Sequence, residues 1–148
     1  KTIHTGKRKG GESWYLTKNK MSKQSELEIH KKVWGTEEWI VNTKDYCGKI
    51  LNLNKGYRCS IHHHKSKDET FHLLSGKILM EINGRKRVMQ EGDVQRIPPL
   101  TRHRFTGLKK SVIIEFSTHH GETDSYRETQ SEKIPKEEFK KLLKRFNT

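Results

Sequence analysis

Short β-rich segments separated by turn residues fill the middle of the chain, from residue 33 to residue 118. Asn83-Gly84 joins two of these segments with a dipeptide typical of a two-residue hairpin. Many short strands with almost no helix between them predict an all-β fold, either an antiparallel sandwich or a barrel. The predicted strands are Glu38–Asn42, Tyr46–Asn54, Tyr57–His64, Thr70–Ser75, Lys77–Ile82, Lys86–Gln90, Val94–Ile97, Arg102–Thr106 and Ser111–Ser117.

The end of the chain has a helical period instead. After Pro135, the residues Phe139, Leu142, Leu143 and Phe146 recur at the spacing of one helix face. Glutamates lie near the start of this segment and basic residues near its end, which suits the helix dipole. We therefore expect a short C-terminal helix laid on the barrel.

The formal net charge of +13 lies mostly in the two ends of the chain. Residues 1–32 carry nine Lys and Arg against three acids and have no sustained apolar period, which predicts a basic N-terminal arm. Residues 133–148 carry six against two, whereas the middle carries sixteen against thirteen. The expected organisation is an arm over 1–32, a barrel over 33–128, and a C-terminal strap and helix over 129–148.

Length and composition narrow the class of protein. A chain of 148 residues has room for one domain of ordinary size. We expect no membrane-spanning helix, because no apolar run approaches 18 residues. No secretory signal is visible, which favours a cytoplasmic location with Cys47 and Cys59 reduced and buried. Charged tails bind nucleic acid weakly, so no specific nucleic-acid partner is expected.

The residues with the clearest chemistry are histidines in the first half of the barrel. Successive side chains on a strand alternate between its faces, so His62 and His64 point one way and His63 the other. Four turn residues follow, and Glu69 then opens the next strand. His103, at the head of a later strand, is the natural fourth member. We expect the two histidines, the glutamate and His103 to converge on one point.

Three imidazoles and one carboxylate form a typical metal-ligand set. They suit Mn, Zn, Fe, Co or Ni, and no thiolate narrows the choice. Four protein ligands on an ion that accepts six leave two positions for water or substrate, as a reactive site requires. The alternative is that these histidines are solvent-facing loop residues. The spacing favours one divalent ion per chain.

This spacing resembles the first motif of the cupin superfamily, in which a glycine, a His-x-His run, a glutamate and a second glycine follow at set intervals. Gly56, His62, His64, Glu69 and Gly76 fill it completely. The resemblance implies a cupin jelly-roll barrel, also called a double-stranded β-helix. It also implies a metal held by the histidines and the glutamate, and a homodimer.

The second cupin motif is matched less fully. Gly92, Pro98 and His103 are in place, whereas Leu100 stands where a glycine is expected and Gly107 where an asparagine is expected. Neither departure falls on a metal ligand of the family. Both therefore concern the shape of a turn.

A narrower resemblance is to small sugar-processing cupins, which include the mannose-6-phosphate isomerase module and the cupin-type lyxose and mannose isomerases. It implies aldose–ketose isomerisation of a small-molecule sugar or sugar phosphate, with Mn or Zn as the favoured ion. The residues that carry it are Trp34-Gly35, Glu38-Trp39, Tyr46, Lys49, the His-x-His run, the IPP and HR segments, IIEFST and Asp124-x-x-Arg127.

Isomerisation needs a group that moves a proton between two carbons. Lys49, which matches a lysine of the resembled enzymes, is one candidate, and Glu115, a carboxylate amid apolar neighbours, is the other. Arg58 shares the predicted face of the histidines and is a candidate to bind a substrate hydroxyl, carboxylate or phosphate. Phe105 is expected to line the pocket. The alternatives are ion pairs for the charged residues and core packing for Phe105.

Four further residues have a structural interpretation. Trp39 is expected in the core or at a dimer face rather than stacked on a sugar. His120 is expected in a loop after the last long strand. Asp124 and Arg127 look like an ion pair that fastens the C-terminal strap.

Two other functions stay open beside sugar isomerisation. One is a cupin-type metal-dependent dioxygenase, and the other is a non-catalytic sugar-binding module. Iron in an apolar pocket would favour the dioxygenase. Lys, Arg and Glu side chains in the pocket would favour sugars.

Overall fold

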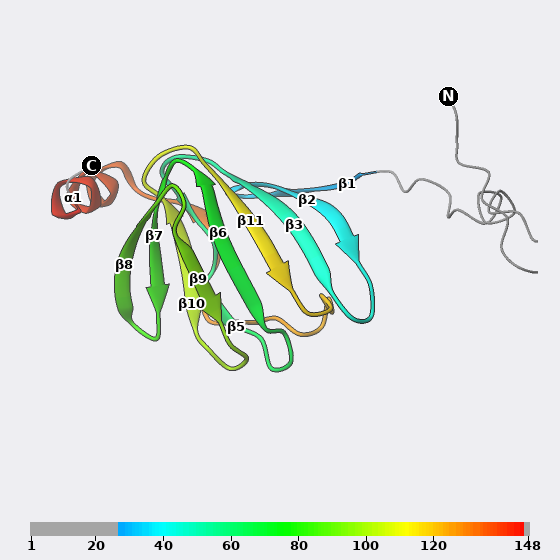
Figure 1. Cartoon of the computed structure of the whole chain (residues 1–148). Helices are drawn as coiled ribbons and strands as arrows, with labels where there is room; N and C mark the ends of the chain where they lie inside the picture. The colour runs from blue at the N-terminus through cyan, green and yellow to red at the C-terminus, as the bar shows by residue number, and fades with distance from the viewer. Residues whose placement is uncertain (1–26, 147–148) are drawn as a thin grey trace, which may run out of the picture.

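Two antiparallel sheets face each other in the computed structural model, which describes residues 27–146 (Figure 1). The first sheet, in spatial order, consists of β1 (Glu28–Lys32), β2 (Gly35–Asn42), β3 (Cys47–Leu53), β11 (Ser111–Ser117), β6 (Glu69–Ser75) and β9 (Val94–Ile97). The second consists of β12 (Tyr126–Arg127), β5 (His62–His63), β10 (His103–Gly107), β4 (Tyr57–Arg58) and β13 (Glu132–Lys133), with β7 (Lys77–Ile82) on β10 and β8 (Arg85–Gln90) on β7.

Alternation along the strands builds one core between the sheets. In β3, β6 and β11 every second residue is buried over most of the strand, as expected where one face packs on a core. The buried apolar cluster joins Phe71 of the first sheet to Phe105 of the second. Cys47 and Cys59 are buried, as predicted, and both are free thiols. The all-β barrel is confirmed.

One predicted strand is wrong. The segment Tyr57–His64 is divided, because β4 ends at Arg58 and β5 begins at His62. Across the second sheet Arg58 stands opposite Thr106, whereas His62 stands opposite His103. The chain advances four positions from Arg58 to His62 but only three from His103 to Thr106 on the partner strand. This extra residue changes which side-chain positions face the core on either side of it.

The first strand begins earlier than the sequence predicts. Glu28–Lys32 form β1, at the edge of the first sheet, although this segment was expected to belong to the basic arm. Three of its five residues are charged and the strand is mostly exposed, so its residue types do not predict a β-strand. Residues 1–26 of the predicted arm lie outside the described residues.

Two turns show how local backbone geometry shapes the barrel. Asn83 and Gly84 take φ values of 48° and 80° between β7 and β8, which confirms the predicted two-residue hairpin. Leu100 has a φ of 65°, a left-handed conformation that disfavours a residue with a Cβ. Its backbone N–H donates to the His64 carbonyl at 2.7 Å, so this turn is tied to the end of β5.

The C-terminal helix α1 (Lys136–Arg145) is confirmed and lies outside the two sheets, at one end of the barrel (Figure 1). Its apolar stripe is only half buried. The ring of Phe139 packs beside Gly56, and Glu138 pairs with Arg58 at 2.7 Å. Within residues 27–146 no helix has the length and apolar character needed to cross a membrane.

Candidate metal centre and pocket

Three histidines converge inside the barrel. His62 of β5 stands directly opposite His103 of β10, and His64 follows β5 by one residue. One ring nitrogen from each lies within 4.8 Å of those of the other two. His103 and His64 are buried and His62 is partly buried. Two strands of one sheet thus bring together residues that are about forty positions apart in the sequence.

Backbone carbonyls hold the three rings in the form that binds metals. The Nδ1 atom of His62 lies 2.8 Å from the Ser60 carbonyl, that of His103 lies 2.9 Å from the Thr101 carbonyl, and that of His64 contacts the Asp124 carbonyl. A carbonyl only accepts, so each Nδ1 carries the proton and each Nε2 keeps a free lone pair. A hydrogen bond from the ring nitrogen that does not face the metal is typical of metal-binding histidines.

Glu69 completes the set from the opposite sheet. Its Oε1 atom lies 3.4 Å from His64 Nε2 and 3.5 Å from His103 Nε2. Two ligand atoms that are each about 2.1 Å from one ion stand about 3.4 Å apart at the tetrahedral angle. His103 Nε2 is buried and makes no hydrogen bond within the described residues. The three histidines could hold a divalent ion, and Glu69 is spaced from His64 and His103 as a further ligand would be.

The charge states of His62 and Glu69 suit a cation, whereas burial, which lowers the pKa of His64, is outweighed by Glu69 and the Asp124 carbonyl, which raise it. Burial lowers the pKa of His62 to about 3, and the neighbouring His103 adds to this effect, so His62 is neutral near pH 7. Burial alone would raise the pKa of Glu69. The imidazoles of His103 and His64 and the ammonium of Lys67 outweigh it and hold the pKa of Glu69 well below its usual range.

Lys67 is a buried cation that the sequence analysis missed. Its Nζ atom contacts the carboxylate of Glu115 and lies 3.5 Å from Glu69 Oε2. Burial lowers the pKa of Lys67, but the two carboxylates outweigh it and raise the pKa above its ordinary value. Lys67 lies in the turn before β6, where strand alternation does not apply, so no local signal in the sequence predicts that it points inward.

Lys49 and Glu115 both reach the interior. They stand directly opposite each other on β3 and β11, so their side chains share a face. The Lys49 side chain is 1% exposed, its Nζ atom lies 3.3 Å from Glu37 Oε2, and it stands 4.3 Å from the centre of the Trp39 ring. Each proton-transfer candidate is thus held by an oppositely charged partner, as the ion-pair alternative also expected.

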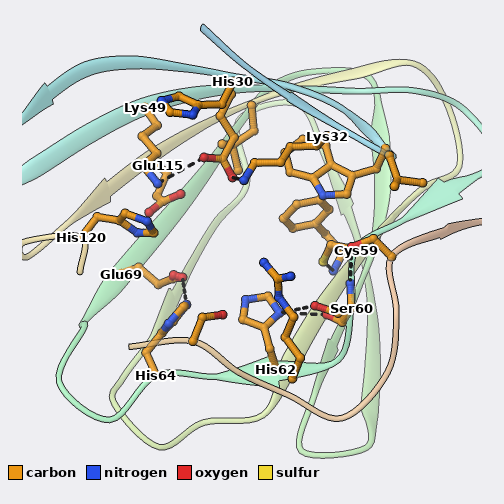
Figure 2. Close-up of a pocket in the computed structure, with 18 of the residues that line it drawn as sticks. His30, Lys32, Lys49, Cys59, Ser60, His62, His64, Glu69, Glu115 and His120 are labelled. Carbon is orange, nitrogen blue, oxygen red and sulfur yellow. Dashed lines mark hydrogen bonds and ion pairs between the residues drawn. The ribbon is translucent and has the colours of Figure 1, made fainter. Parts of the chain in front are cut away.

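A cavity of about 400 Å³ lies in front of these groups. Figure 2 shows His62 and His64 at one end of it and Lys49 at the other, with Glu69 and Glu115 along the side between them. This volume is in the range of small-molecule sites. Phe105, Trp39, His120 and Arg127 also line the cavity.

The aromatic residues that line the cavity also pack against other rings of the barrel. Phe105 lines the cavity and also packs edge-on against Trp34 at 5.1 Å between ring centres, so both of its interpretations hold. Trp39 faces the cavity and stacks on His30, at 4.3 Å between ring centres. His120 lies in a loop, as expected, and its ring meets Trp39. Burial and the charge of Lys49 lower the pKa of His120 to about 3.

Arg58 is not among the residues that line the cavity. It donates from Nε to Glu132 at 2.8 Å and from Nη1 to Glu138 at 2.7 Å. Its predicted place on the histidine face is wrong because the alternation shifts between β4 and β5. Arg58 instead fastens the strap and α1 to the barrel.

The predicted ion pair between Asp124 and Arg127 is also wrong. The Asp124 carboxylate accepts backbone N–H groups of Lys65, Ser66 and Lys67 at 2.7–3.0 Å. No ion pair joins Asp124 to Arg127 in the described part of the chain. The strap is thus held by the turn that precedes Glu69, and Arg127 is left on the pocket wall.

Comparison with known proteins gives a match to a domain family. Residues 49–116 match the Cupin domain family. A D-lyxose/D-mannose isomerase of Thermosediminibacter oceani is 28% identical, in a match that covers 64% of this chain and 68% of that protein.

Solved structures agree on the fold. KdgF from a Halomonas species has a TM-score of 0.61 at 18% identity, covering 68% of this chain and 98% of that one. A variant of Streptomyces PAC13 with uridine has a TM-score of 0.66 at 16% identity, covering 80% and 98%. The capsular polysaccharide assembling protein CapF of Staphylococcus aureus has a TM-score of 0.63 at 19% identity, covering 70% of this chain but only 33% of CapF. The chain contains a cupin domain and has the cupin fold.

Proposed function

We propose that this protein is a metal-dependent sugar isomerase that interconverts an aldose and a ketose. The observation that carries the proposal is the meeting of His62 and His64, which line the cavity, with the buried His103, while Lys49 and Glu115 line the same cavity. The 28% identity to a D-lyxose/D-mannose isomerase supports the same reaction. Our proposed substrate is a small sugar, free or phosphorylated.

One divalent ion is the proposed cofactor, with Mn or Zn favoured. His62, His64, His103 and Glu69 would hold it through three nitrogens and one oxygen, a donor set that both ions accept. When bound, such an ion supplies Lewis acidity for polarising a carbonyl oxygen.

The chain's own residues would move the proton. In our proposal the Glu115 carboxylate takes the proton from C2 of the aldose, the electron pair of the C2–H bond forms a C1–C2 double bond, and the π pair of the C1 carbonyl moves onto O1, which gives an enediolate. Glu115 then returns the proton to C1, while the O2 proton passes to O1 and the O2–H electron pair forms the C2 carbonyl of the ketose. The Lys49 ammonium, oriented by Glu37, donates a hydrogen bond to a substrate oxygen. Lys67 holds the Glu115 carboxylate in place.

The polarity of the cavity favours this reaction over oxygen chemistry. Lys49, Lys67 and Glu115 are all buried and line it, so it is not the apolar pocket that a dioxygenase would favour. A carboxylate and an ammonium beside the metal ligands also give the site acid and base groups that a purely binding module does not need.

Metal replacement with a sugar panel tests the proposal. The full chain is stripped of metal, Mn, Zn, Co, Fe and Ni are restored one at a time, and free and phosphorylated pentoses and hexoses are followed by NMR. We expect aldose–ketose exchange with at least one ion and incorporation of solvent deuterium at C1 or C2 in deuterated water. Full metal loading without turnover of any sugar would overturn the proposal.

A further inference from the structure

Arg127 stands beside the candidate metal centre, and its side chain has no ion-pair or hydrogen-bond partner among residues 27–146. It lies on β12 directly opposite His62 of β5. Residues opposite each other on antiparallel strands project from the same face of the sheet. His62 points into the barrel, so Arg127 does too, and it lines the same cavity.

The buried lysines of the cavity are already neutralised by carboxylates. Lys49 lies 3.3 Å from Glu37, and Lys67 contacts Glu115 and lies 3.5 Å from Glu69. These ammonium groups have little capacity left for a charged ligand.

Arg127 differs from most other arginines of the chain. Arg58, Arg96, Arg102 and Arg104 each form an ion pair with a carboxylate. Across residues 27–146, the Arg127 guanidinium has no ion pair and no hydrogen bond. It is also exposed at the cavity wall, so a ligand can reach it without breaking an existing contact.

A free guanidinium in a sugar-sized cavity has a clear chemical preference. Its planar fork binds carboxylate and phosphate groups through two parallel hydrogen bonds, which a neutral hydroxyl does not match. The formal charges that line the cavity are five basic side chains against four acids, before any metal is added. They are Lys31, Lys32, Lys49, Lys67 and Arg127 against Glu37, Glu69, Glu115 and Glu122.

We propose that the ligand of this cavity is an anionic sugar, whose phosphate or carboxylate is bound by Arg127. This inference rests on the proposed function for the sugar itself and adds the charge of that sugar. Arg127 is then the residue that selects anionic over neutral sugars.

Binding of sugars that cannot isomerise tests the inference without any turnover. Isothermal titration of the full Zn-loaded chain compares sorbitol 6-phosphate with sorbitol, and methyl glucuronide with methyl glucoside. We expect at least one anionic ligand to bind about tenfold or more tightly than its neutral partner. The pair that shows the preference identifies phosphate or carboxylate as the bound group.

Two variants assign the preference to the pocket arginine. Arg127→Gln is expected to abolish it without changing the thermal midpoint, because the side chain has no partner to lose. Arg87→Gln removes an exposed arginine of β8 that pairs with Asp93 outside the cavity, and it should leave the preference intact. Equal affinities within both ligand pairs, or a preference that survives Arg127→Gln, would overturn the inference.

The result of the anion-binding test can be distinguished from the result of the isomerase test. An anion preference that depends on Arg127, in a protein that isomerises no sugar, would leave the anion site standing and remove the proposed reaction. Rapid isomerisation of neutral sugars with no effect of Arg127→Gln would do the reverse.

Discussion

His62 and His63 are neighbours in one two-residue strand, yet they lie on opposite faces of the sheet. His62 turns inward to the metal centre, whereas His63 stacks on Tyr126 with 5.2 Å between ring centres and 15° between ring planes. The two imidazoles therefore offer a matched pair of substitutions, identical in chemistry and adjacent in the chain.

His62→Gln is expected to lose bound metal, because one of the three converging nitrogens disappears from a set that has no spare imidazole in the described chain. Metal content per chain, measured by atomic emission after dialysis, checks this. His63→Gln should keep the wild-type content. Full loading of both variants would show that the ligands have been assigned incorrectly.

Glu115→Gln is expected to lower kcat by about 10²- to 10⁴-fold, the usual range for loss of a general base. The metal content should stay at one ion per chain, because Glu115 contacts Lys67 and not the histidines. Glu128→Gln removes a carboxylate that pairs with Arg102 away from the cavity and should leave kcat unchanged. A Glu115→Gln enzyme with wild-type kcat would remove Glu115 from the mechanism.

Lys67→Met is expected to destabilise the metal-free protein by about 3–5 kcal/mol, because it leaves two buried carboxylates without their cation. Urea unfolding gives the free energy directly. The double variant Lys67→Met/Glu115→Leu should recover part of the loss, since it removes one of the two stranded charges. Additive effects of the two changes would mean that the pair is not coupled.

Glu37 is expected to make stability depend on pH at the acid end. Burial raises the pKa of Glu37, but Lys49, Trp39 and Lys32 outweigh it and lower the pKa below 4.5. A carboxyl whose folded-state pKa is depressed stabilises the protein above its unfolded pKa, and this contribution is lost as the pH falls through the folded value.

The matching experiment compares unfolding free energies of wild type and Glu37→Gln between pH 7 and pH 3. The wild type should be the more stable protein at pH 7, and the difference should shrink as the pH falls below 4.5. A difference that stays constant over this interval would show that the Glu37 carboxylate gains nothing from its neighbours.

The sequence predicted the barrel and the meeting of the histidines because both follow from strand alternation. Val94–Ile97 and Ser111–Ser117 begin and end as predicted, and Glu69 joins His103 across the barrel. Alternation failed at Arg58, where an extra residue between two short strands shifts the face, and such a shift leaves no mark in the residue types. The homodimer, the cytoplasmic location and the domain boundaries stay predictions.

The charge pattern of the sequence did not predict the burial of Lys67 or the strand Glu28–Lys32. Lys67 lies in a turn rich in polar residues, where a lysine usually faces water, and only its distant partner Glu115 accounts for its burial. Glu28–Lys32 form a strand although most of their side chains are charged, because an edge strand need not bury both faces. Such long-range pairings are decided by tertiary structure and not by the local sequence.

Each of the three Nδ1 atoms is bonded to a peptide carbonyl, and His62 alone adds a side-chain contact, to Ser60 Oγ at 3.4 Å, which has an evolutionary consequence. Every residue type presents the same carbonyl oxygen, so Thr101 can be replaced without loss of the bond that orients the His103 ring. Descendants of this chain can thus remodel the walls around the three rings and acquire new specificities while inheriting an unchanged centre.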